Sequence, residues 1–171
     1  MPIIRVLAAV FLVFAAAAAR AQNMAGIPAA ACTASETATH GGLYLVGGAS
    51  VRFSAGTAGS FTLNCPVQKF TSATSGWNLK FTYQDSSGKL LGGQAMAQLF
   101  MLPAGSASPA LLASVNSNAS GLTGLATLAS PLLTHTFDFE HNIYWIRIIL
   151  KRDDPKYMVA AHSVVLDGSG F

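Results

Sequence analysis

The chain has 171 residues, of which 51% are hydrophobic and only 10% are charged, and its formal net charge is +3. This length fits a single domain, and the charged fraction lies well below the usual ~25% of soluble domains. These values exclude a coiled coil, a nucleic-acid-binding surface and a charge-rich disordered chain, and they leave secreted, envelope and membrane proteins.

Residues 1–21 are predicted to be a cleaved export signal. Arg5 gives a positively charged start, residues 6–19 are apolar, and Ala19-Arg20-Ala21 is a small-x-small cleavage site. The apolar stretch is shorter than the roughly 20 residues of a spanning helix, which favours a signal over an anchor. Cleavage would leave eight basic against seven acidic residues, so no polyanion-binding charge remains. We therefore expect an exported protein, periplasmic or extracellular, with no membrane span after cleavage and no nucleic-acid partner.

Residues 22–41 are rich in Ala, Thr, Gly and Pro without periodicity, which predicts a loose arm ahead of a main domain at residues 42–171. Cys32 and Cys65 are the two cysteines of the chain. In an oxidising compartment such a pair most often forms one structural disulfide. The competing interpretation is lipid attachment at Cys32, but the usual leucine three residues earlier is missing, and Cys65 would be left unpaired.

The first half of the main domain predicts strands separated by glycine-rich turns, because apolar and polar residues alternate with a period of two. The expected strands are residues 43–46, 51–54, 61–65, 77–83 and 95–102. Trp77, Leu79, Phe81 and Tyr83 should share one face of their strand, and Met96, Gln98, Phe100 and Leu102 should share one face of the next. These two strands are candidates for an antiparallel pair.

The second half is less regular before it becomes the clearest part of the chain. Residues 103–131 are expected to be irregular, with a strand at 111–115 and a helical hint at 122–128, where leucine recurs every three residues. Residues 134–139 should be a strand with Phe137 and Phe139 inward. Residues 143–151 and 157–166 should form a hairpin around a polar turn, the second strand placing Met158, Ala160, His162, Val164 and Leu166 on one face.

Roughly eight or nine strands at this spacing, with no helices alternating between them, predict an all-β fold. We expect a two-layer antiparallel β-sandwich, jelly-roll-like in strand number, with one disulfide. An immunoglobulin-type sandwich is the runner-up, but Cys32 and Cys65 do not bracket Trp77 as the Cys-Trp-Cys order of antibody domains requires.

The layout resembles a group of uncharacterised exported bacterial β-sandwich proteins. The matching features are the cysteine soon after the leader, a glycine-rich strand pair, Asn64-Cys65-Pro66-Val67 at a strand end, the run at residues 142–148, and a final strand at residues 161–166. The resemblance implies a sandwich and a disulfide. It implies no activity and transfers no catalytic residue.

Residues 135–141 contain the candidate metal ligands His135, Asp138 and His141. On an extended strand His135 and Asp138 face opposite sides, so a metal site would require a bend, and a polar edge strand is the simpler interpretation. Asp138 and Glu140 have the spacing of paired carboxylates but are also common on solvated sheets.

Hydrolase chemistry would need His162 as a base, with Ser54 or Ser163 as nucleophile and Asp167 as orienting acid. Neither a Gly-x-Ser-x-Gly elbow nor a His-Glu-x-x-His motif is present. No catalytic residue and no cofactor are therefore predicted.

Trp145 and Arg147 are the candidate ligand-binding residues, because they project from the face of their strand opposite Tyr144. An exposed tryptophan beside polar groups can stack on a sugar ring or anchor a protein. Burial of Trp145 beneath residues 103–131 is nevertheless favoured.

The first functional hypothesis is a non-enzymatic exported protein with a structural or binding role, its partner a surface glycan or an envelope protein. A carbohydrate-binding module is the first alternative, and a small secreted hydrolase or metal-dependent enzyme is the second.

Overall fold

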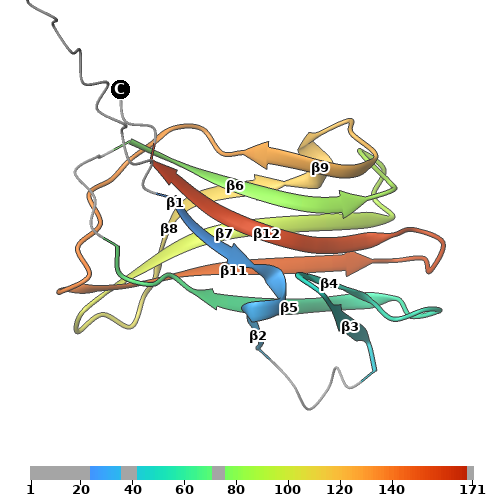
Figure 1. Ribbon diagram of the computed structural model, residues 1–171, viewed down its shortest axis with the longest axis horizontal. Coiled ribbons are helices and arrows are strands. Elements are labelled where there is room, and N and C mark those ends of the chain that lie inside the picture. Colours follow the sequence, from blue (N-terminus) through green and yellow to red (C-terminus); the bar gives the residue numbers. More distant parts are fainter. Residues whose placement is uncertain (1–23, 36–41, 71–75, 169–171) are drawn as a thin grey trace, which may run out of the picture.

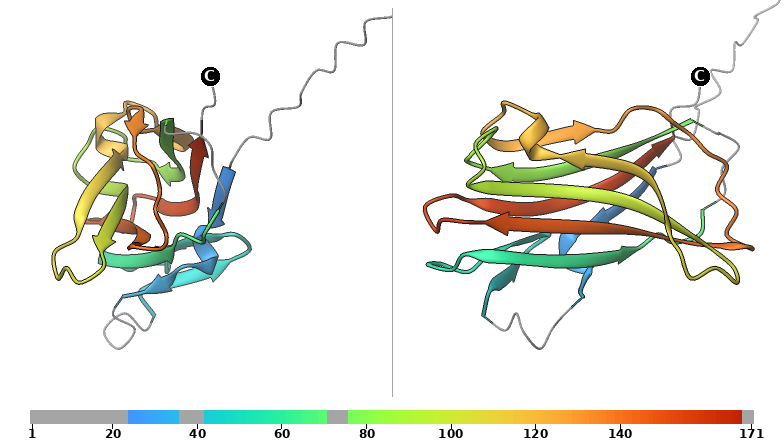
Figure 2. Two further views of the ribbon diagram at one scale, coloured as in Figure 1. Left: turned by 90° about the vertical axis from the view of Figure 1, so that its left-hand side faces the viewer. Right: turned by 180° about the vertical axis from the view of Figure 1, so that it is seen from behind.

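The computed structural model describes residues 24–35, 42–70 and 76–168, and within them two antiparallel sheets pack face to face (Figures 1 and 2). The seven-stranded sheet contains β1 (Met24–Pro28), β3 (Tyr44–Gly47), β4 (Ser50–Phe53), β6 (Gly76–Asp85), β9 (Gly124–Ala129), β10 (Leu133–Thr134) and β12 (Val159–Gly168). The five-stranded sheet contains β2 (Thr33–Ala34), β5 (Gly59–Pro66), β7 (Gly93–Pro103), β8 (Ala110–Asn116) and β11 (Asn142–Arg152). Two short 3₁₀ turns, η1 (Ala29–Ala31) and η2 (Ser117–Ala119), complete the described part, which contains no helix with the length and apolarity to cross a membrane.

The predicted two-layer antiparallel sandwich is confirmed, and its core lies between alternate side chains of the long strands. β6 and β11 supply most of the large buried side chains: Trp77, Leu79, Phe81 and Tyr83 from β6, and Tyr144, Ile146, Ile148 and Leu150 from β11. Their neighbours on each strand point outward, as the pleat requires. The alternation read from the sequence therefore assigned the inner faces of these two strands correctly.

The predicted hairpin of the last two long strands is wrong. β11 pairs with β5 and β7 in the five-stranded sheet, whereas β12 pairs with β1, β4 and β6 in the seven-stranded sheet. The polar turn therefore carries the chain from the five-stranded sheet to the seven-stranded sheet. The proposed pairing of β6 with β7 is wrong for the same reason. A polar turn suits both a hairpin and a crossing between layers, so local sequence does not distinguish them.

The predicted inner face of β12 is correct only in its second half. The register between β12 and β6 shifts between Ala161 and Ser163, which places a β-bulge at His162. Before the bulge the core receives Val159 and Ala161, and after it Val164 and Leu166. One additional residue reverses the parity of a strand, so Met158 and Ala160 do not share a face with Val164.

The expectation of a loose arm at residues 22–41 is wrong for its described part, residues 24–35. β1 pairs with β12 over five residues, and β2 pairs with β5 over two. The Cys32–Cys65 disulfide is confirmed, so Cys32 is not free for lipid attachment. Backbone pairing of small residues needs no apolar alternation, and for that reason the segment shows no period. The predicted leader, residues 1–21, lies outside the described residues, as do residues 22–23 and 36–41.

Residues 103–131 contain two strands. β8 confirms the strand expected at 111–115, and β9 replaces the helical hint at 122–128. β9 pairs with β6 in regular antiparallel register from Gly124 to Ala129. This sheet position determines the conformation, because glycines at 121 and 124 give a short helix little stability of its own.

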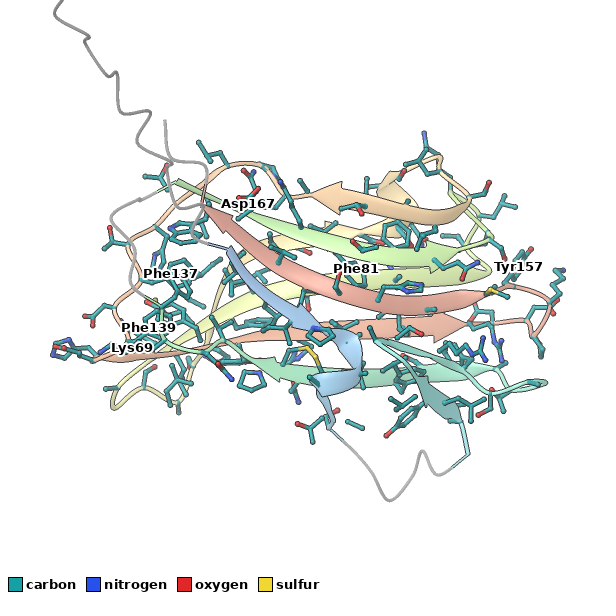
Figure 3. All side chains as sticks on the ribbon, viewed as in Figure 1. Lys69, Phe81, Phe137, Phe139, Tyr157 and Asp167 are labelled. Carbon is teal, nitrogen blue, oxygen red and sulfur yellow. A yellow bond between two sulfur atoms is a disulfide. The ribbon has the colours of Figure 1, made fainter. Side chains whose placement is uncertain are left out.

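Of the strand expected at residues 134–139, only Thr134 pairs with β6, together with the preceding Leu133. The following residues cross one end of the sandwich and turn Phe137 and Phe139 against the core, which agrees with their predicted inward orientation (Figure 3). Phe70, Trp77 and Tyr144 join these rings, with centroid separations of 4.8 to 5.2 Å between neighbours. This end of the sandwich is therefore closed by aromatic rings.

Candidate functional site

Trp145 lies on the outer face of the five-stranded sheet, because its neighbours Tyr144 and Ile146 face the core. It stands directly opposite Phe100 of β7, and the two rings stack with centroids 5.4 Å apart and planes 16° apart. Both side chains are partly exposed. Trp145 thus lies outside the buried core that the sequence favoured for it, and β8 pairs beside β7 within the same sheet.

Arg147 lies one pleat further along β11 and places its guanidinium 4.8 Å from the centroid of the Phe100 ring. This cation–π contact contributes about 0.5–1 kcal/mol at an exposed site. In the strand register Arg147 stands between Gln98 of β7 and Asn64 of β5, and Ser114 of β8 stands beside Gln98. A row of hydrogen-bonding side chains thus crosses the sheet next to the aromatic pair.

The five strands of this sheet contain no aspartate or glutamate. Lys151, further along the outer face of β11, is paired with Asp153 of the following turn at 3.2 Å. Arg147 makes no ion pair with any described residue, and its guanidinium lies over the Phe100 ring. We define the outer face as Asn64, Gln98, Phe100, Trp145 and Arg147. It combines an aromatic surface, amide groups and one cation that is not paired with a carboxylate of the described part of the chain.

The three candidate metal ligands do not converge. Asp138 Oδ2 and His141 Nδ1 lie 2.8 Å apart at the exposed end of the sandwich. The hydrogen bond with the His141 side chain, followed by that from the Glu140 backbone N–H, lowers the pKa of the Asp138 carboxyl group. His135 instead bonds the Tyr144 hydroxyl, and no group of three metal-ligating side chains occurs among residues 24–35, 42–70 and 76–168.

His135 is held as a structural residue by Tyr144. The Tyr144 hydroxyl accepts the backbone N–H of Asp138 at 3.1 Å and lies 3.1 Å from His135 Nε2. Because that hydroxyl already accepts a bond, its hydrogen is available to Nε2 of a neutral imidazole. Burial lowers the pKa of His135, which favours this neutral form.

The residues considered for hydrolase chemistry are also separated. His162 occupies the bulge of β12, where its Nε2 is buried and makes no hydrogen bond with any described residue. Asp167 forms an ion pair with Lys80 of β6 and therefore does not orient an imidazole. In the other candidate arrangement, the carboxylate pair of Asp138 and Glu140, the Asp138 side chain accepts the backbone N–H groups of Glu140 and His141, which is the geometry of a polar turn. No nucleophile–base–acid arrangement results from these groups.

Sequence reasoning found Trp145 and Arg147 but missed Phe100, Gln98 and Asn64 as their neighbours. The alternation along residues 95–102 already placed Phe100 and Gln98 on one shared face of their strand. What the alternation could not supply is the pairing of β7 with β11, which joins residues far apart in the chain.

No protein-family model and no curated protein matches the chain. Among solved structures it is similar to the CBM36-1 domain of a multidomain xylanase from the hindgut metagenome of Trinervitermes trinervoides, at 12% identity and a TM-score of 0.47, covering 87% of this chain and all of that one. It is also similar to the Stig cyclase Fisc from Fischerella sp. TAU (11% identity, TM-score 0.44, 85% and 84% covered) and to TmCBM61 in complex with β-1,4-galactotriose (14%, 0.39, 85% and 88%). At these identities the likeness is one of β-sandwich fold, and we derive the function from this chain's own side chains.

Proposed function

We propose that the chain is an exported, non-enzymatic binding protein that takes up a glycan on the outer face of its five-stranded sheet. The observation that carries this proposal is the partly exposed Trp145–Phe100 stack beside a row of amide and guanidinium groups. A partly exposed aromatic ring suits the C–H face of a sugar ring, and the adjacent polar groups suit its hydroxyls.

Each residue of the outer face has a distinct role in this proposal. Trp145 and Phe100 provide the apolar contact area, and Arg147 and Gln98 provide hydrogen bonds in a fixed register. Asn64 adds an amide whose Oδ1 makes no hydrogen bond with any described residue. Because rigid strands carry all five side chains, little ordering entropy opposes binding.

The proposed location, periplasmic or extracellular, is supported by the Cys32–Cys65 disulfide, since such bonds persist in oxidising compartments. A protein confined there can meet glycans of a cell surface or its surroundings. A purely structural role is the competing function, and it predicts that the outer face binds no sugar.

The test is affinity electrophoresis of the oxidised protein against xylan, cellulose, galactan and polygalacturonate derivatives, followed by calorimetry with the matching oligosaccharides. Binding should weaken about five- to thirtyfold in Trp145→Ala, since the lost aromatic contact contributes about 1–2 kcal/mol. The matched control is Leu125→Ala, which removes an exposed side chain from β9 of the other sheet and should leave binding unchanged. Equal affinity of Trp145→Ala and the parent protein, or no binding to any of these polysaccharides, contradicts the proposal.

A further inference from the structure

A second candidate site lies at the end of the sandwich opposite Phe137 and Phe139, near Tyr157 (Figure 3). There the connection between β11 and β12 passes the β3–β4 hairpin and leaves a hollow of about 240 Å³. Three cations line it, Arg52, Arg152 and Lys156, together with apolar groups of Phe53, Tyr157 and Met158. No aspartate or glutamate contributes to its lining.

Arg152 is the unusual member of this group, because it is only 6% exposed and has no carboxylate partner among the described residues. Its Nη2 donates to the carbonyl oxygens of Ser54 and Thr57 and to Thr57 Oγ1, and its Nη1 donates to the Tyr157 carbonyl at 3.4 Å. The guanidinium also lies 4.7 Å from the centroid of the Phe53 ring. All of these partners are neutral, and Nε is buried with no hydrogen-bond partner among the described residues.

A buried charge without a counter-charge is costly, since hydrogen bonds to neutral groups replace only part of its hydration. The same burial lowers the pKa of Arg152. An anion in the adjacent hollow would supply the missing counter-charge in a place where solvent screens it weakly.

The other two cations strengthen this electrostatic preference. Arg52 is exposed and forms no ion pair with any described residue. Lys156 is paired with Asp154 at 2.9 Å and lies 4.9 Å from the centroid of the Tyr157 ring. Arg52 at the rim therefore offers a guanidinium that no described carboxylate occupies, and Arg152 in the wall adds its positive charge.

We propose that this hollow binds a small organic carboxylate with an apolar body, its carboxylate held between Arg52 and Arg152 and its body against Tyr157 and Met158. Guanidinium groups match the planar geometry of a carboxylate. The apolar lining favours an organic acid over an inorganic anion, because an inorganic anion has no apolar part to pack against Phe53, Tyr157 and Met158. This site is separate from the outer face, whose residues lie on β5, β7 and β11 away from this end of the sheet.

Arg152 also connects β11 to the turn that contains Ser54 and Thr57, so its removal would disturb the fold. The test therefore uses Arg52, which is exposed. Benzoate is titrated into the oxidised protein by NMR, with benzamide as the uncharged analogue and sulfate as the anion without an apolar body. Benzoate should shift the amides of Tyr157 and Val159, and benzamide should bind at least about tenfold more weakly.

Arg52→Gln should weaken benzoate binding about tenfold, whereas Lys69→Gln, at the opposite end of the molecule in Figure 3, should not change it. Equal binding of benzoate and benzamide would show that charge is not recognised and overturn the proposal. Sulfate binding as tightly as benzoate overturns the organic-acid class. No shift near Tyr157 at about 10 mM benzoate, or an equal effect of the Lys69 variant, overturns the site itself.

Discussion

Reduction of the Cys32–Cys65 disulfide should destabilise the protein by a predictable amount. The bond closes a loop with a sequence separation of 33 residues. In the chain-entropy model a loop of this length restricts the unfolded chain enough to stabilise the fold by about 3.7 kcal/mol at 25 °C. For a chain of this size that free energy corresponds to a fall in Tm of roughly 7 to 15 °C.

The effect should also be unequal across the fold. Cys65 is fully buried on β5, and Cys32 connects η1 to β2, which is held to β5 by only two residue pairs. β1 pairs with β12 over five residues and belongs to the other sheet. Reduction should therefore accelerate amide hydrogen exchange first in β2 and then in β1, while β6 and β11 exchange only with global unfolding.

Urea denaturation of the oxidised and the reduced protein measures this difference directly. The reduced parent protein keeps both sulfur-containing side chains, so it isolates the covalent link, whereas Cys32→Ala/Cys65→Ala also leaves a cavity at the buried Cys65 position. The double variant should therefore be somewhat less stable than the reduced parent protein. A loss below about 1 kcal/mol on reduction, or uniform exchange across β1, β2 and β6, would refute this reasoning.

Three further predictions concern single side chains. Tyr144→Phe removes the hydroxyl that serves both His135 and the Asp138 N–H, and the free energy of unfolding in urea should fall by about 1–2 kcal/mol; an unchanged midpoint would show that these bonds add nothing. Because burial holds the pKa of His135 in the folded protein below its ordinary value of about 6.5, the unfolded chain binds more protons between the two values. Stability should therefore rise as pH increases through that window and be complete above about 6.5, and His135→Gln should flatten the slope of a urea-midpoint series against pH. Gly93→Ala would place a Cβ 2.8 Å from Val159 Cγ2 and 2.9 Å from Ser87 Oγ, so a thermal melt should show that the free energy of unfolding falls by about 1–3 kcal/mol. Gly47→Ala is the control, because its Cβ would meet nothing within 4 Å and the free energy of unfolding should stay within about 0.5 kcal/mol of the parent value.

The sequence predicted those parts of the fold that depend on local alternation. β6 and β11 each bury every second residue over almost their whole length, so their inner faces could be read directly from the period of two. The disulfide could be predicted because the chain contains two cysteines, which leave one intramolecular pairing.

The sequence could not predict features that depend on contacts distant in the chain. The turn between β11 and β12 has the same composition whether the strands pair or separate into two layers. The bulge at His162 adds one residue to an otherwise regular pattern, and only the partner strand reveals it. β1 was missed because its five residues show no alternation of apolar and polar side chains, and its pairing with β12 is made by backbone groups.

The candidate site was predicted in part for the same reasons. Parity along β11 separated Trp145 and Arg147 from the core, but the stack with Phe100 depends on the long-range register of β7. The histidine cluster failed as a metal site because Tyr144, an inward residue of β11, binds His135 while Asp138 turns to His141. The nearness of the two histidines in the sequence did not reveal that each binds a different partner.

The most direct test of the proposed function is a ¹H–¹⁵N NMR titration of the oxidised protein with the oligosaccharide that binds most tightly in calorimetry. The account predicts that the Trp145 indole signal and the amides of Arg147, Phe100, Gln98 and Asn64 shift together with one dissociation constant. Shifts confined to β6 and β9 of the other sheet, with the Trp145 indole unmoved at saturation, would contradict the assignment of the outer face as the glycan-binding site.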